Sequence, residues 1–175
     1  MLKYPFLAIK KRLQDKVPDL LEVEWYVSQY LQNNEIHLIT TPCAYIQFER
    51  LPTDQHQDGI QSAEMKVRIH CVSEALFSDS QRITDEVINH TGLADQIHIA
   101  LNGWEAMLSD LPGQAALKGT DQDVVLVNRM VRSELLPDHS LSNLIATVQT
   151  YEAMAFDYSA RPAWIEKVAN LKIPK

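Results

Sequence analysis

The chain contains few of the motifs on which common enzyme sites depend. Only five glycines occur in 175 residues. None forms the Gly-x-Ser-x-Gly nucleophile turn, the Gly-x-x-x-x-Gly-Lys phosphate loop or the Gly-x-Gly-x-x-Gly dinucleotide turn. No apolar run approaches the roughly 18 residues of a membrane helix, and the first residues lack the charged, then apolar pattern of a signal peptide. The sequence therefore predicts a cytoplasmic protein with no membrane partner.

Cysteine is scarce as well. Cys43 and Cys71 are the only two, and both fall inside strand-like runs, where a thiol behaves as a small buried apolar group. In the cytoplasm both thiols are expected to be reduced. The six histidines include no pair three or four residues apart, the close spacing by which zinc sites usually reveal themselves. We therefore expect no metal site, no other cofactor and no catalytic residue.

The composition is that of an ordinary globular protein. Hydrophobic residues make up 46% of the chain and charged residues 22%, which argues against wholesale disorder. A formal net charge of -7 makes broad attraction to a nucleic-acid backbone unfavourable. Since 175 residues is short for two domains, we expect one domain and no nucleic-acid partner.

The most informative stretch is an alternation of apolar and charged residues over positions 63–71. The apolar positions are Ala63, Met65, Val67, Ile69 and Cys71, and the polar positions between them are Glu64, Lys66, Arg68 and His70. In a strand, such a period of two sends one set of side chains to each face. We therefore expect an antiparallel sheet that is covered on one side only. Its charged face is interpreted either as solvated or as paired with another subunit.

Similar patterns predict the rest of the fold. They indicate a helix over 6–16, strands over 21–30, 42–49, 61–72, 124–132 and 144–157, polar loops over 51–59 and 109–123, and a turn near 136–138. A helix remains an alternative for 21–30. Residues 83–104 suit one helix interrupted near Thr91-Gly92 or two helices, with an end near Asn102-Gly103.

Strands grouped apart from helices indicate an α+β fold, with a mainly antiparallel sheet and helices packed on one face. Residues 1–158 are expected to form this single domain. Residues 159–175 are expected to form a C-terminal helical extension, because Trp164, Ile165, Val168 and Leu171 have helical spacing.

Several segments resemble the tail terminator and tail-completion proteins of long-tailed phages, especially those of prophages of Bacteroides-type bacteria. The resemblance covers about residues 1–158. It is carried by the N-terminal helix, the run Thr-Pro-Cys-Ala-Tyr-Ile-Gln-Phe at 41–48, the strand 65–72, the helix 93–104 and the closing Val-Gln-Thr-Tyr-Glu at 148–152. Each pattern is short, and it is their order and spacing that carry the resemblance.

The resemblance implies a protein without catalytic residues that acts during virion assembly. Such a protein caps the growing tail tube as a ring, usually of six subunits, meets the head-completion proteins, and ends in the virion tail after assembly in the cytoplasm. A ring requires two different complementary patches on each subunit. We expect one patch to include Glu64, Lys66, Arg68, His70, Asp54 and Gln57.

Two other functions stay open at this stage. The first is a small metal-assisted hydrolase that uses His56 with Asp54 and Asp58, although a solvated polar turn also explains these residues. The second is a binding module that captures a peptide or partner strand along an open sheet edge.

Overall fold

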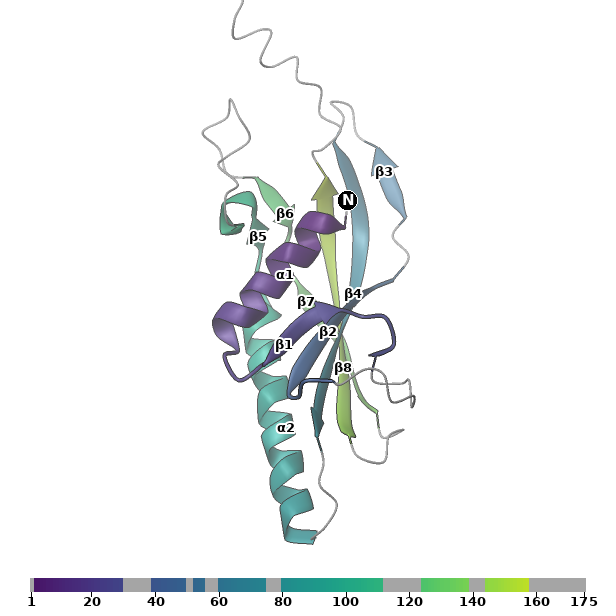
Figure 1. Ribbon diagram of the computed structural model, residues 1–175. Helices are drawn as coiled ribbons and strands as arrows, with labels where there is room; N and C mark the ends of the chain where they lie inside the picture. Colours follow the sequence, from purple (N-terminus) through teal and green to yellow (C-terminus); the bar gives the residue numbers. More distant parts are fainter. Residues whose placement is uncertain are drawn as a thin grey trace, which may run out of the picture.

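Two long antiparallel strands form the centre of the protein (Figure 1). The computed structural model describes residues 2–29, 39–49, 52–55, 60–74, 80–111, 124–138 and 144–157. Within them lie α1 (Lys3–Lys16), β1 (Glu22–Trp25), β2 (Cys43–Phe48), β3 (Thr53–Gln55), β4 (Gln61–Glu74), α2 (Ser80–Leu101), β5 (Ala106–Met107), the 3-10 turn η2 (Leu108–Asp110), β6 (Val125–Val127), β7 (Val131–Asp138) and β8 (Leu144–Asp157).

The sheet has the order β1-β2-β4-β8-β6-β5, with β3 also paired to β4 and β7 to β8. Strands β4 and β8 run antiparallel over their full length, from the pair Gln61 and Asp157 to the pair Glu74 and Leu144. The β1-β2 pair is parallel, and the other pairs are antiparallel. This confirms the predicted α+β class and the mainly antiparallel sheet.

Both helices cover the same face of the sheet (Figure 1). The apolar positions of β4 lie on this face and are buried, with Met65, Val67 and Ile69 exposed by 1% or less. They form one core with Ile9 of α1 and Ile97 of α2. The alternation in β4 therefore predicted the buried face correctly.

The structure resolves two alternatives that the sequence left open. Residues 22–25 are a strand and not a helix. This strand is shorter than the predicted 21–30, because the Gln29 side chain donates a hydrogen bond to the Trp25 carbonyl (2.6 Å) and accepts one from the Val27 amide (2.7 Å). Helix α2 is continuous through Gly92.

The end of α2 follows the sequence prediction. Leu101 is its last residue, and Gly103 has a φ of 79°, a left-handed conformation that glycine adopts without strain. We expect Gly103→Ala to lower the free energy of unfolding by about 1 kcal/mol in urea denaturation. Gly92→Ala is the control. A Cβ added at Gly92 would meet open space on the helix surface, so this variant should raise the free energy of unfolding by roughly 0.5–1 kcal/mol. Equal effects of the two variants would contradict this account.

The predicted strand 124–132 is present at both ends but interrupted in the middle, and the predicted turn near 136–138 is wrong. Residues 128–130 interrupt the strand, because Asn128 bonds Met154 through both its backbone N–H and its side-chain oxygen. The Met130 N–H bonds the Trp104 carbonyl. Strand β7 then continues through Pro137. A proline is tolerated there because, among the described strands, β7 pairs only with β8. The short strands β3 and β5 were also not predicted.

The alternation suggested a sheet that is covered on one side only. The structure shows apolar packing on part of the other side as well. At one end of the opposite face, a second apolar cluster contains Cys43, Tyr45, Val72 and Ala146 packed against Tyr26, Ile39 and Leu144. Both cysteines are free and buried, and burial raises the pKa of the Cys43 thiol to about 12 and also raises that of Cys71. Both thiols therefore stay protonated and unreactive near neutral pH.

The described residues contain two α-helices, α1 and α2. Neither is long and apolar enough to span a membrane.

Candidate functional site

Beyond the second apolar cluster, the face of the sheet opposite the helices carries charge. We call this surface the open face; it consists of Gln47, Glu49, Glu64, Lys66, Arg68, Glu152 and Met154. The register of the strands places Lys66 beside Glu152, and Glu64 beside Met154. Glu49 follows β2 and forms ion pairs with the Arg68 guanidinium at 2.6 Å and with the Lys66 ammonium at 3.7 Å.

These ion pairs stabilise the isolated fold little. The side chains of Glu49, Lys66 and Arg68 are 29% to 40% exposed, and ion pairs at such sites contribute about 0–1 kcal/mol. Glu64 and Glu152 are exposed and form no ion pair with another described residue. The open face therefore offers two unpaired carboxylates beside two partly shielded cations, which a second surface of complementary charge could contact.

His70 does not belong to this exposed patch, although its position in the alternation predicted it. The residue is only 5% exposed. Its ring stacks on Tyr26 with centroids 4.1 Å apart, and its Nε2 lies 2.8 Å from Gln47 Oε1 in a hydrogen bond. Because the chain after β1 crosses this end of the sheet, the polar side chain is covered where the alternation alone indicated solvent.

The polar loop next to the open face is described only in part. Asp54 is exposed on β3, opposite Ser62 of β4. Gln57, His56 and Asp58 lie outside the described residues. In the part of the chain that is described, no three His, Cys, Asp or Glu side chains are grouped so that they could hold a metal ion.

An apolar edge borders the sheet at β7. Val131, Leu135 and Leu136 are 54%, 49% and 46% exposed. The outer edge of β7 pairs with no other described strand. A long edge strand with exposed apolar side chains is a template for association with another chain.

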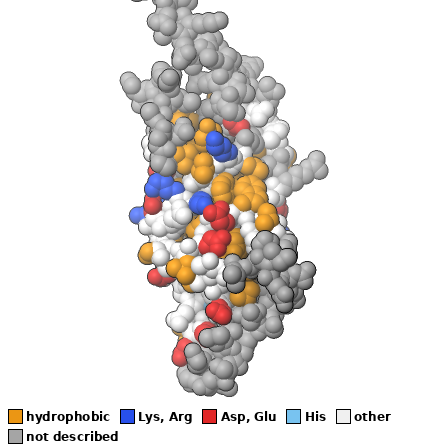
Figure 2. Space-filling model, viewed as in Figure 1, with side chains coloured by type: hydrophobic (Ala, Val, Ile, Leu, Met, Phe, Trp, Pro, Cys, Tyr) orange, Lys and Arg blue, Asp and Glu red, His pale blue; other side chains and the backbone are white. Residues whose placement is uncertain are grey.

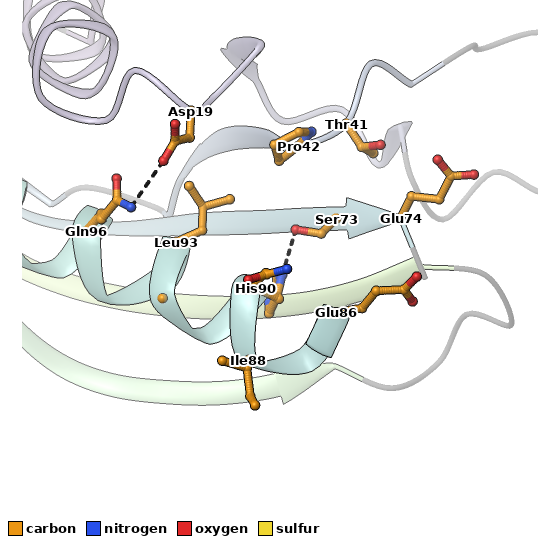
Figure 3. Close-up of a pocket in the computed structure, with 12 residues that line it drawn as sticks. Asp19, Thr41, Pro42, Ser73, Glu74, Glu86, Ile88, His90, Leu93 and Gln96 are labelled. Atoms are coloured by element: carbon orange, nitrogen blue, oxygen red, sulfur yellow. Dashed lines mark hydrogen bonds between the residues drawn. The ribbon is translucent and has the colours of Figure 1, made fainter. Parts of the chain in front are cut away.

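A pocket of about 680 Å³ opens between α2, the end of β4 and the segments at Asp19 and Thr41-Pro42 (Figure 3). We call it the α2 pocket. Its apolar lining residues are Pro42, Ile88 and Leu93, and its charged lining residues are Asp19, Glu74 and Glu86. No described Lys or Arg lines it. Among the described side chains on the face drawn in Figure 2, the charged ones toward the N-terminal end of α2 are Asp and Glu, while Lys and Arg lie near α1.

His90 forms the inner wall of the α2 pocket. Its Nδ1 lies 2.9 Å from the Ser73 hydroxyl, and its Nε2 is hydrogen-bonded to the Thr147 hydroxyl. Burial lowers the pKa of His90 to about 4. A general base works best with a pKa near the operating pH, so this imidazole is better suited to its role as a neutral link that ties α2 to β4 and β8.

Sequence reasoning missed the α2 pocket, although part of its signal was present. His90, Leu93 and Ile97 are spaced by three and four residues, which places His90 on the buried stripe of the helix. The structure shows this stripe to be buried, while Val87 and Ile88 of the same helix are 44% and 62% exposed. The other parts of the pocket come from separate segments that no local pattern brings together.

No protein-family model matches the chain, and no curated protein matches it.

Proposed function

We propose that this protein is a structural assembly subunit that acts by contacting copies of itself, in the manner of the tail terminator proteins that its sequence resembles. In this role it has no catalytic activity and forms a ring that caps a phage tail tube and meets head-completion proteins. The observation that supports the proposal is the open face, a charged sheet surface that no described helix covers.

The open face and the β7 edge differ in character, as a ring requires. A heterologous contact joins two different patches, and repeating it around an axis closes a ring. The open face presents Glu64, Glu152 and the cations at Lys66 and Arg68, whereas the edge presents Leu135 and Leu136. Each subunit thus has two chemically distinct surfaces with which to contact its neighbours.

The first test is light scattering of the purified protein over a concentration series. We expect the molar mass to rise toward a closed oligomer. The double variant Lys66→Glu/Arg68→Glu should raise the dissociation constant about tenfold or more, since it puts two further carboxylates beside Glu64 and Glu152, and their mutual repulsion grows when the contact removes them from water. Lys3→Glu/Lys16→Glu, an equal charge change on exposed positions of α1, should leave association unchanged. A monomer at every concentration would contradict the proposal.

A second variant separates association from stability, because reversing Lys66 and Arg68 also breaks their pairs with Glu49. Glu152→Lys changes an exposed carboxylate that has no ion pair within the described chain. It should weaken association with an unchanged melting temperature. Glu105→Lys, at an exposed position outside the open face, is its matched control. If Glu152→Lys associates like the control, the open face is not the contact.

A further inference from the structure

The α2 pocket combines an apolar wall with an acidic rim. Figure 3 shows Leu93 facing toward Pro42, with Glu74 and Glu86 together on one side. Asp19 lies on the opposite side, where it accepts a hydrogen bond from Gln96 at 3.2 Å. A volume of about 680 Å³ is within the range of pockets that hold ligands or inserted side chains. The chemistry of the lining selects an occupant that is apolar on one side and basic on the other.

The chain itself contains a segment of this character. Residues 158–175 lie outside the described structure, and their sequence places Trp164, Ile165, Val168 and Leu171 at helical spacing. The same 18 residues include Arg161, Lys167, Lys172 and Lys175 but only one acidic residue, Glu166. The segment is therefore basic, whereas the chain as a whole has a net charge of -7.

The position of Asp157 argues against docking of this segment in its own pocket. Asp157 pairs with Gln61 at one end of β4, and the pocket residues Ser73 and Glu74 lie at the other end. Twelve residues of strand separate Gln61 from Ser73, which is about 40 Å at roughly 3.3 Å per residue. Residues 158–163 extend over at most about 20 Å, and a helix over 164–171 adds about 12 Å. With residues 164–171 helical, the segment does not reach the Ser73–Glu74 end of its own pocket.

We propose that the basic amphipathic segment 161–172 of one copy docks in the α2 pocket of a neighbouring copy, with its apolar side chains on Pro42 and Leu93 and its cations beside Asp19 and Glu74. This inference rests on the proposed self-association and identifies the segment that links the copies. It also gives a role to the only part of the chain that the resemblance to tail terminators does not cover.

The test is a charge swap in the full-length protein. Lys167→Glu/Lys172→Glu should raise the dissociation constant measured by sedimentation equilibrium about tenfold or more. Asp19→Lys/Glu74→Lys, at two exposed positions, should do the same. An equimolar mixture of the two variants should associate more tightly than either alone, because the reversed segment then meets the reversed pocket. Lys3→Glu/Lys16→Glu is the control for a charge change elsewhere.

The outcomes separate this inference from the proposed function. If the protein stays monomeric at every concentration, the self-association on which the proposed function and the docking both depend does not occur. An oligomer that neither reversal weakens overturns the docking of the segment and leaves the proposed function standing. Weakening by both reversals without recovery in the mixture also overturns it. Hydrogen exchange gives a second readout: Trp164→Ala should increase exchange around Leu93 only at concentrations where the wild-type protein is associated.

Discussion

Replacing Gln149 by alanine is expected to lower the free energy of unfolding by about 3–5 kcal/mol. Gln149 is fully buried; its Nε2 donates to the Ala94 carbonyl of α2 at 2.6 Å, and its Oε1 accepts the Tyr151 hydroxyl at 2.7 Å. The substitution removes two buried hydrogen bonds, leaves the Tyr151 hydroxyl without a partner, at a cost of about 1–3 kcal/mol, and opens a cavity. Urea denaturation followed by circular dichroism measures the loss.

A double-mutant cycle tests whether the hydrogen bond itself is responsible. Tyr151→Phe removes only the hydroxyl group and should cost roughly 1–2 kcal/mol. Burial raises the pKa of Tyr151, so the phenol stays protonated and donates at all ordinary pH values. The cycle uses Gln149→Leu as its second single variant. In Gln149→Leu/Tyr151→Phe both polar partners are absent, and the combined loss should be smaller than the sum of the losses in Gln149→Leu and Tyr151→Phe by about 0.5–3 kcal/mol. Additive losses would show that the two side chains act independently.

The same pair shows what a sequence pattern can and cannot predict. The strand β8 was predicted correctly over 144–157, because its turn-flanked alternation is long. The alternation also placed Gln149 and Tyr151 on one face with each other. It could not show that this polar pair faces the helices, since that depends on the Ala94 carbonyl, 55 positions away in the chain.

Local patterns failed where a distant backbone decided the structure. The apolar run at 124–127 predicted a strand that continues to 132, but Asn128 bonds to Met154 and the strand is interrupted. Likewise, Pro137 indicated a turn, because a central strand would exclude it. Proline is acceptable there because, among the described strands, β7 pairs with β8 alone. No local pattern encodes this pairing.

For the candidate site, the sequence predicted charge but not shape. Glu64, Lys66 and Arg68 lie on the predicted face, and the alternation required nothing more than strand geometry to place them there. His70 was placed on the same face, but Tyr26 covers it. The α2 pocket could not be predicted, because its walls come from four segments that only the folded protein brings together.

Acidification should destabilise the protein through His90, and this is the second large effect that we expect. Its pKa is about 4 in the folded protein, below the ordinary value of 6.5, because burial disfavours the charged ring. The unfolded chain therefore binds a proton between pH 6.5 and 4, where the folded protein does not. Stability is full above pH 6.5 and falls as the pH drops to 4, and the shift corresponds to about 3 kcal/mol.

Comparing variants isolates this contribution from the carboxylates Asp19, Glu74 and Glu86 nearby, which all variants share. His90→Gln should be less stable at pH 7, since it strains the hydrogen bonds to Ser73 and Thr147, yet its free energy of unfolding should fall less between pH 6.5 and 4. Thr147→Val removes one of those bonds but keeps the imidazole, so it should keep the steep decline. If His90→Gln and the wild-type protein lose stability in parallel over this range, the buried imidazole is not the group that titrates.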